Sequence, residues 1–222
     1  MGNLYLVRHG QASFGADDYD VLSPLGHQQA KRLGEYFKGK GIVFDAALTG
    51  TLQRQVSTFS GICHGMQSQL EALQWSGLNE YDSHAVIATV HTGKLEKPTT
   101  PEMYRHHFRL LKDGLKQWID GTVSPEGMPS YSDFVLGVTN ALDHVRAHCT
   151  GNVLLVSSGG PIATAVGHVL ACSPETTIEL NLRIRNSSVT EFAFTPKRHM
   201  LVTYNTLPHL DSPAHESWIT YA

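Results

Sequence analysis

The sequence has few of the features that would place the protein outside the ordinary class of soluble domains. Three of its 222 residues are cysteines, without CxxC spacing, so neither a disulfide framework nor a zinc site is expected. The formal net charge of −3 gives no basic field for nucleic acid or an anionic membrane. No apolar run approaches the ~18 residues of a membrane-spanning helix. These absences favour a cytoplasmic protein in a reducing compartment.

The length and composition are enough for one buried core. Apolar residues make up 41% of the chain, and we expect a single domain over 1–222 with a mainly helical insertion at about 81–148. An apolar stretch, Leu4–Val7, stands so near the start that we expect no signal peptide before it.

Short apolar strands alternate with amphipathic helices along the chain. Strands are predicted at 4–7, 44–48, 153–157, 188–194 and 200–205, and helices at 22–41, 51–64, 99–121, 132–149 and 161–171. This order predicts an α/β fold, a three-layer sandwich with a mostly parallel central sheet flanked by helices. Ligands of such sheets bind at the carboxyl ends of the strands.

Two of the predicted helices have clear start signals. Ser23 precedes Pro24 and Thr100 precedes Pro101, and in each pair the first residue can cap a helix that begins at the proline. Apolar residues at helical spacing predict the packing side of the second of these helices. They are Tyr104, Phe108, Leu111, Leu115 and Trp118.

The first strand ends in Arg8-His9-Gly10. Imidazole titrates near pH ~6.5, so His9 can be a neutral nucleophile at neutral pH. Arg8 offers a planar fork of donors for phosphate oxygens, and Gly10 lets the backbone approach a ligand closely. Taken alone, the tripeptide is as compatible with a structural histidine beside a solvated arginine.

Four further segments follow in order. They are G-x-x-QA at Gly26, Gln29 and Ala30, L-x-R-x-x-x-T at Leu52, Arg54 and Thr58, a loop glutamate at Glu80, and a strand ending in SSGG at 157–160. Together with RHG, these segments resemble the histidine phosphatase superfamily, which contains cofactor-dependent phosphoglycerate mutases and many broad phosphatases. The resemblance covers most of the chain and is weakest in the helical section.

The resemblance implies a role for each matching residue. His9 would be the nucleophile that forms a phosphohistidine, and Glu80 would protonate the leaving alcohol and then activate water. Arg8 and Arg54 would hold the phosphoryl oxygens, at about 1.5–3 kcal/mol per charge-assisted hydrogen bond, without a metal or other cofactor. Arg54 lies roughly 200° around its helix from Leu52 and so faces solvent or a cleft. The plainer alternatives are an exposed loop carboxylate and a solvated helix arginine.

Ser158 departs from the family pattern, which has a histidine there. In one interpretation, the Ser158 hydroxyl and the backbone N–H groups of Gly159 and Gly160 still hold phosphate at a helix start. In the other, the pocket binds phosphorylated ligands without turnover. Losing one oxyanion donor costs on the order of 10²–10³ in rate, which favours a slow enzyme over an inactive one. His209 is a possible replacement donor, or else a surface histidine in a turn set by Pro208.

The sequence RHGQASFG at 8–15 is a second departure. Gln11 and Ser13 are candidate phosphate-binding residues, and Gly15 stands where the common family pattern has asparagine. The chain therefore looks like a divergent branch of the family, one with RHGQASFG and a serine in the second motif. The substrate of such a branch does not follow from the mutases.

We therefore expect a metal-independent phosphatase that hydrolyses small phosphorylated metabolites. A mutase must also hold a bisphosphate, and the helical section has scattered basic residues but no dense cluster beside Glu80; they are Lys94, Lys97, Arg105 and Arg109. A catalytically impaired, phosphate-binding regulator is the third hypothesis. The sequence does not indicate an oligomeric state.

Overall fold

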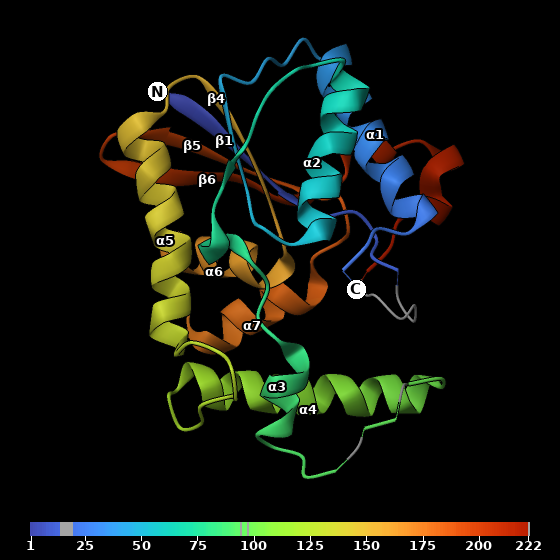
Figure 1. Ribbon diagram of the computed structural model, residues 1–222, viewed down its shortest axis with the longest axis vertical. Helices are drawn as coiled ribbons and strands as arrows, with labels where there is room; N and C mark the ends of the chain where they lie inside the picture. The colour runs from blue at the N-terminus through green and yellow to red at the C-terminus, as the bar shows by residue number, and fades with distance from the viewer. Residues whose placement is uncertain (14–19, 94, 97, 222) are drawn as a thin grey trace.

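A six-stranded sheet lies at the centre of the computed structural model, which describes residues 1–13, 20–93, 95–96 and 98–221 (Figure 1). The strand order is β3-β2-β4-β1-β5-β6. The strands are β1 (Gly2–Arg8), β2 (Ala46–Thr49), β3 (Leu73–Gln74), β4 (Asn152–Ser157), β5 (Val189–Thr195) and β6 (Arg198–Thr206). The first four are mutually parallel, β5 runs antiparallel to β1, and β6 runs antiparallel to β5. The prediction of a mostly parallel sheet is confirmed.

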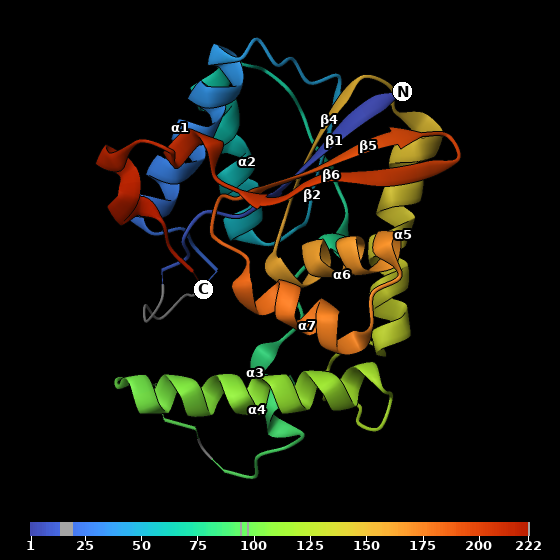
Figure 2. The same cartoon turned by 180° about the vertical axis from the view of Figure 1, so that it is seen from behind.

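Helices cover both faces of this sheet. The main ones are α1 (Pro24–Gly39), α2 (Gln53–Met66), α5 (Tyr131–His148), α6 (Gly159–Leu170) and α7 (Pro174–Arg183). Figures 1 and 2 show α1 and α2 on one face and α5, α6 and α7 on the other. Side chains of β4 alternate between the two cores: Leu154 packs with α1 and α2, and Leu155 packs in the other core. The predicted three-layer arrangement is therefore confirmed.

The predicted helix starts are confirmed by their capping bonds. The Ser23 hydroxyl accepts a hydrogen bond from the Gly26 N–H at 3.0 Å at the start of α1. The Thr100 hydroxyl accepts one from the Met103 N–H at 3.3 Å at the start of α4 (Pro101–Ile119). Both helices have proline in the first turn, where no backbone N–H is needed.

The predicted packing side of α4 is only half right. Leu111, Leu115 and Trp118 are buried, but Tyr104 and Phe108 are each 40% exposed. The reason is that α4 extends past the elements that cover its C-terminal half, so its N-terminal end lies beyond α7 (Figures 1 and 2). The short α3 (Ser83–Ala88) lies against α4, and neither α3 nor α7 is among the helices predicted above.

Helix α7 has the same start signal as the predicted helices. Ser173 precedes Pro174, and the Ser173 hydroxyl accepts a hydrogen bond from the Thr176 N–H at 3.3 Å. Short 3-10 turns complete the chain: η1 (Ser76–Leu78), η2 (Pro208–Leu210) and η3 (Pro213–Trp218). Across the described ranges, we find no helix that combines the length and the apolar character needed to cross a membrane.

Candidate active site

The carboxyl ends of β1 and β4 bring the two halves of the candidate site together. The strands are parallel neighbours, and Arg8 lies opposite Ser157 in their register. The His9 N–H donates to the Ser157 carbonyl at 2.9 Å, which continues the ladder one residue past the strand. His9 and Ser158, which are 149 residues apart in sequence, therefore leave the sheet side by side.

The His9 imidazole is held in a defined tautomer. It is 2% exposed, and its Nδ1 lies 2.7 Å from the Gly10 carbonyl oxygen, a partner that can only accept, so Nδ1 carries the proton. The Arg54 Nε–H donates to His9 Nε2 at 3.3 Å, so the lone pair of Nε2 faces the guanidinium. Burial lowers the pKa of His9 well below its ordinary value, and the charges of Arg8 and Arg54 lower it further. His9 is therefore a neutral imidazole with a directed lone pair.

The backbone around His9 is fixed from behind. Its carbonyl accepts from the Ser187 N–H at 3.1 Å and from the Asn186 amide at 3.4 Å. The next residue, Gly10, donates its N–H to the Thr58 hydroxyl of α2 at 3.0 Å. The Thr58 hydroxyl in turn donates to the Arg54 carbonyl at 2.7 Å. One threonine thus connects residues 9–13, here called the histidine loop, to the first turn of α2, which carries Arg54.

The G-x-x-QA segment packs α1 directly on the same loop. A Cβ atom on Gly10 would lie 2.5 Å from the Gly26 carbonyl oxygen, and one on Gly26 would overlap the Gln11 carbonyl. The Gln29 side-chain oxygen accepts the Gln11 N–H at 2.8 Å. The Gln29 amide also donates to the Trp218 carbonyl at 2.7 Å, which holds the C-terminal segment against α1. The contacts of Gly26 and Gln29 are therefore with the backbone, and these residues position the loop after His9.

Two buried arginines flank the imidazole. Arg8 is 4% exposed and donates through one terminal nitrogen to the Ile184 carbonyl at 2.5 Å. Arg54 is 7% exposed and forms a 2.7 Å ion pair with Asp20, whose other carboxylate oxygen accepts the Gln53 N–H at 2.9 Å. Asp20 thus caps α2 and orients Arg54 together. Arg54 is buried against His9 and Asp20, so the alternative of a solvated arginine is wrong.

Glu80 reaches the site from the loop after η1. Its two carboxylate oxygens lie 3.1 and 3.2 Å from the Gly160 backbone nitrogen at the start of α6. Burial raises the pKa of this carboxyl, and the Gly160 hydrogen bond and the charges of Arg8 and Arg54 only partly offset the rise. A carboxyl that stays protonated at higher pH than usual is suited to general acid catalysis. The alternative of an exposed loop carboxylate is wrong, because Glu80 is half-buried.

Ser158 and Gly159 lie at the start of α6. Ser158 is fully buried at the N-cap position, and its hydroxyl accepts from the Gln55 amide at 2.9 Å. Gly159 is the first helical residue, and a Cβ atom there would lie 3.7 Å from Arg8 Nε. The Gly160 N–H is the donor that Glu80 occupies. Of the two backbone N–H groups predicted to bind phosphate, that of Gly160 therefore donates to Glu80 instead, and Gly159 lies close to Arg8.

The other predicted binding residues lie in the loop after His9. The Gln11 side-chain oxygen accepts from the Ser23 hydroxyl at 2.7 Å, which leaves its amide nitrogen as the group that can donate to a ligand. The half-buried Ser13 donates its N–H to the Val21 carbonyl at 2.8 Å. Phe14 and Gly15, which complete the RHGQASFG sequence, lie outside the described residues. The phosphate contacts of Gln11 and Ser13 stay predictions.

His209 is buried in η2, so the alternative of a surface histidine is wrong. It is 2% exposed, and its Nε2 shares a 3.0 Å hydrogen bond with the Ser187 hydroxyl. Burial lowers its pKa to about 3, and the Arg32 charge contributes. The contact that the structure gives His209 is therefore with the residue that supports the His9 carbonyl, and its role as a replacement phosphate donor stays a prediction.

Sequence reasoning missed two polar side chains at the site. Asp20 stood among several loop aspartates without a distinguishing feature. Gln55 carried a usable signal, because it continues the register of the apolar residues Leu52, Phe59 and Ile62 on α2 and is fully buried there. A polar residue on the buried side of a helix needs hydrogen-bond partners, and at this helix they are groups of the site.

The candidate site brings together two guanidinium groups, one imidazole and one carboxyl. Two arginines, a neutral imidazole and a raised-pKa carboxyl converge from three separate segments of the chain: the end of β1, helix α2 and the loop after η1. Phosphoryl transfer needs this combination of positive charge and positioned proton donors. Over the described part of the chain, no group of three or more His, Cys, Asp or Glu side chains is arranged to hold a metal ion. The expectation of a metal-independent reaction stays a prediction.

Comparison with protein families agrees with this geometry. The model of the histidine phosphatase superfamily (branch 1) matches residues 4–207. A 2,3-bisphosphoglycerate-dependent phosphoglycerate mutase of Mesorhizobium japonicum is 38% identical over 87 residues, which cover 36% of this chain and 42% of the mutase. The matched segment thus spans well under half of that relative.

Two other proteins are similar over more of the chain. A broad-specificity phosphatase of Saccharomyces cerevisiae is 28% identical over 72% of this chain and 66% of its own length. The crystal structure of a phosphoserine phosphatase from Entamoeba histolytica, in complex with phosphoserine, superposes with a TM-score of 0.65. It covers 95% of this chain and 100% of its own at 22% identity, which shows a shared fold.

Proposed function

The chain belongs to the histidine phosphatase superfamily, and from this premise we propose that it hydrolyses small phosphomonoesters through a phosphohistidine at His9, without a metal ion. The observation that carries the proposal is the His9 tautomer. Nδ1 donates to a carbonyl and the Nε2 lone pair faces Arg54 in a buried site. An imidazole that two nearby guanidinium groups keep neutral has a lone pair that can attack phosphorus. The same positive charges then stabilise the phosphoryl oxygens in the transition state.

In the first step, His9 Nε2 attacks the phosphorus atom and the bond to the ester oxygen breaks. Arg8 and Arg54 neutralise the equatorial oxygens, and Ser158 with the Gly159 N–H completes the pocket. Glu80, protonated because burial raises its pKa, gives its proton to the departing alkoxide. In the second step, the Glu80 carboxylate takes a proton from water as the water attacks the phosphohistidine, which releases phosphate and restores both groups.

The test is hydrolysis of p-nitrophenyl phosphate in the presence of EDTA. The wild-type protein should turn over, and His9→Ala should abolish turnover because the attacking nitrogen is lost. His27→Ala, which removes an exposed imidazole from α1, is the matched control and should keep wild-type activity. Turnover that disappears with EDTA and returns with a divalent cation would contradict the metal-independent mechanism, and equal activity in His9→Ala would contradict the nucleophile.

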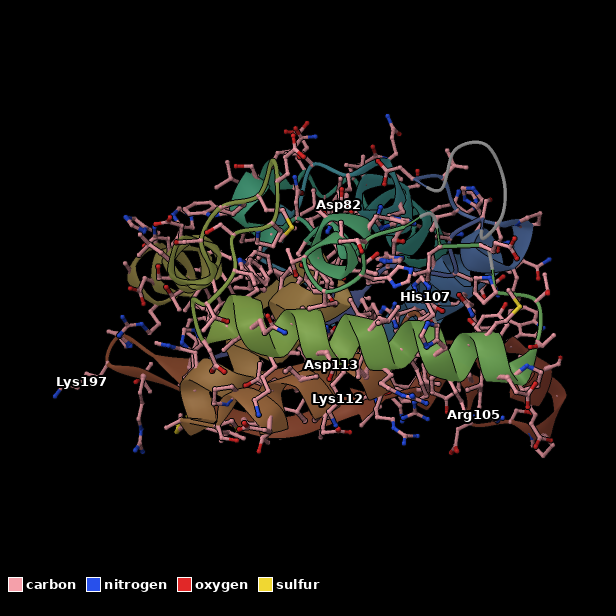
Figure 3. The ribbon with its side chains drawn as sticks, turned by 90° about the horizontal axis from the view of Figure 1, so that it is seen from below. Asp82, Arg105, His107, Lys112, Asp113 and Lys197 are labelled. Atoms are coloured by element: carbon pink, nitrogen blue, oxygen red, sulfur yellow. The ribbon has the colours of Figure 1, made fainter. Side chains whose placement is uncertain are left out.

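Phosphoglycerate mutase activity is the second candidate, favoured by the 38% identity to the Mesorhizobium japonicum mutase. The basic residues of the helical section give it little support. Arg105 is exposed on α4 and pairs with Glu102 of the same helix at 2.5 Å, and Figure 3 shows it on the side of α4 away from Asp82 of α3. Arg109 is also exposed, and Lys94 and Lys97 lie outside the described residues.

An assay with 3-phosphoglycerate and catalytic 2,3-bisphosphoglycerate separates the two candidates. Formation of 2-phosphoglycerate faster than release of inorganic phosphate would establish the mutase. Phosphate release from a panel of small esters, without isomerisation of 3-phosphoglycerate, is the expected result. Binding of phosphate without turnover of any ester would select the third hypothesis, a catalytically impaired phosphate-binding regulator.

A further inference from the structure

Gln55 is a fully buried polar side chain at the site that the mechanism above does not use. Its amide nitrogen donates to the Ser158 hydroxyl at 2.9 Å and to the Leu78 carbonyl at 2.9 Å. Its side-chain oxygen accepts the Leu52 N–H at 3.3 Å. A Cβ atom on Gly50 would overlap this oxygen, so a residue without a side chain makes room for the amide. Gln55 is thus held at both ends of its amide group.

This arrangement fixes what Ser158 can do. An amide nitrogen only donates, so the Ser158 oxygen is the acceptor and its hydroxyl hydrogen must point elsewhere. Ser158 follows β4, directly beside the point where His9 follows β1. A Cβ atom on Gly159, the next residue, would lie 3.7 Å from Arg8 Nε. Ser158 and His9 therefore leave the sheet at the same edge, where a phosphoryl group on His9 could accept the hydroxyl hydrogen.

We propose that Gln55 is a positioning residue that makes the Ser158 hydroxyl a hydrogen-bond donor to the phosphoryl group. The inference rests on the proposed function, and it gives the Ser158 substitution a physical explanation. A free serine hydroxyl rotates among three positions and can donate or accept. When Gln55 occupies an acceptor site of the oxygen, the rotation that remains favourable presents hydrogen to an anion. The pair then supplies a directed donor at the place where the family pattern has a histidine.

A competing explanation is that Gln55 only supports the loop that carries Glu80. Its second acceptor, the Leu78 carbonyl, lies two residues before Glu80 and also accepts from the Ser157 hydroxyl at 2.7 Å. Both explanations predict that a Gln55 variant loses activity. They differ in the serine on which the loss depends. If Gln55 orients Ser158, the loss should require Ser158. If Gln55 supports the loop before Glu80, the loss should instead depend on Ser157, whose hydroxyl bonds to the same Leu78 carbonyl.

A double-mutant cycle on kcat distinguishes them. We expect Ser158→Ala to lower kcat on the order of 10²-fold, as for one lost oxyanion donor. We expect Gln55→Leu to lower it about tenfold in the wild-type background and less than about twofold in Ser158→Ala, because the group that Gln55 orients is then absent. In the Ser157→Ala background, Gln55→Leu should keep its full tenfold effect. Equal losses in the wild-type and Ser158→Ala backgrounds would overturn the proposal.

Gln55→Glu provides a second variant with nearly the wild-type shape. Its carboxylate accepts hydrogen bonds, so the Ser158 hydroxyl would turn toward it and present lone pairs to the phosphoryl oxygens. The loss of kcat should exceed that of Gln55→Leu at pH about 8 and shrink as the carboxyl gains a proton toward pH about 5. A loss that does not change with pH relative to wild type would contradict the proposed polarity. Melting temperatures identify any variant that fails to fold.

Binding of inorganic phosphate keeps this test separate from the proposed function. If the wild-type protein hydrolyses no ester, the proposed function fails, but a directed donor should still strengthen the binding of the anion. The same cycle is then measured by calorimetry as the dissociation constant of inorganic phosphate. Coupling between Gln55 and Ser158 supports the inference whether or not turnover occurs, and additive effects on affinity overturn it.

Discussion

Thr58 provides the most direct test of how the site is held together. The variant Thr58→Val keeps the shape of this fully buried side chain and removes its hydroxyl. The Gly10 N–H then loses its 3.0 Å partner, while the Arg54 carbonyl, which accepts the other bond, remains within α2. The expected loss is therefore that of one buried donor without a partner, about 1–3 kcal/mol of the free energy of unfolding.

The melting temperature is the assay. For chains of 150–250 residues, each kcal/mol shifts it by about 2–4 °C, so Thr58→Val should melt roughly 2–12 °C below wild type. Turnover should fall about tenfold, because the unpaired N–H belongs to the residue after His9 and a displacement of about 1 Å costs up to 10²-fold.

The control is Thr139→Val on α5. The Thr139 hydroxyl donates to the Leu136 carbonyl at 3.3 Å, and within the described residues no backbone N–H donates to it, so its loss should shift the melting temperature by less than about 2 °C. If Thr58→Val melts with this control and keeps wild-type turnover, then the threonine does not connect the histidine loop to α2 and the account of the site is wrong.

Two further predictions concern the proton transfers. Glu80→Gln should lower kcat/KM for an alkyl phosphate by about 10²–10⁴-fold but for p-nitrophenyl phosphate much less, because kcat/KM reports the step in which the ester bond breaks and nitrophenolate leaves without a proton. Equal losses in kcat/KM, with Glu126→Gln as the exposed control, would contradict the acid role. Wild-type kcat/KM should fall on the acidic side only well below pH 6.5, because burial and two arginines lower the pKa of His9, which must be unprotonated. For an alkyl phosphate, kcat/KM should also fall on the alkaline side as Glu80, whose pKa burial raises, loses its proton, and this alkaline fall should be absent in Glu80→Gln.

The family resemblance identified the candidate site residues, and the fold pattern indicated where two of the segments that carry them would meet. A parallel pair of apolar strands brings His9 and Ser158 together whatever the intervening 148 residues do. The capping pairs Ser23-Pro24 and Thr100-Pro101 encode helix starts in two residues each. The capping pairs need no knowledge of tertiary contacts, and the pairing of the two strands follows from the alternation of strands and helices along the chain.

The remainder depends on contacts between segments far apart in the chain. The exposure of Tyr104 and Phe108 follows from where α4 ends relative to its neighbours, which helical periodicity does not encode. His209 is buried because η2 packs against α1, a contact across more than 170 residues. Gln55 finds its partners in two different loops, so only the polar residue itself, and not its role, is visible in the sequence.

The seam between Gly26 and the histidine loop has a consequence for how the motifs are used to recognise relatives. The backbone of α1 at Gly26 is in direct contact with the backbone at Gln11. Any larger residue at position 26 would therefore displace the histidine loop and with it the His9 imidazole. The glycine of the G-x-x-QA segment is thus required by the close packing of two backbone segments, so it should also be present in members of the family that have no catalytic activity. A search that ranks related chains by whether they keep both His9 and Arg54, and not by this segment, should therefore separate active enzymes from inactive proteins of the same fold.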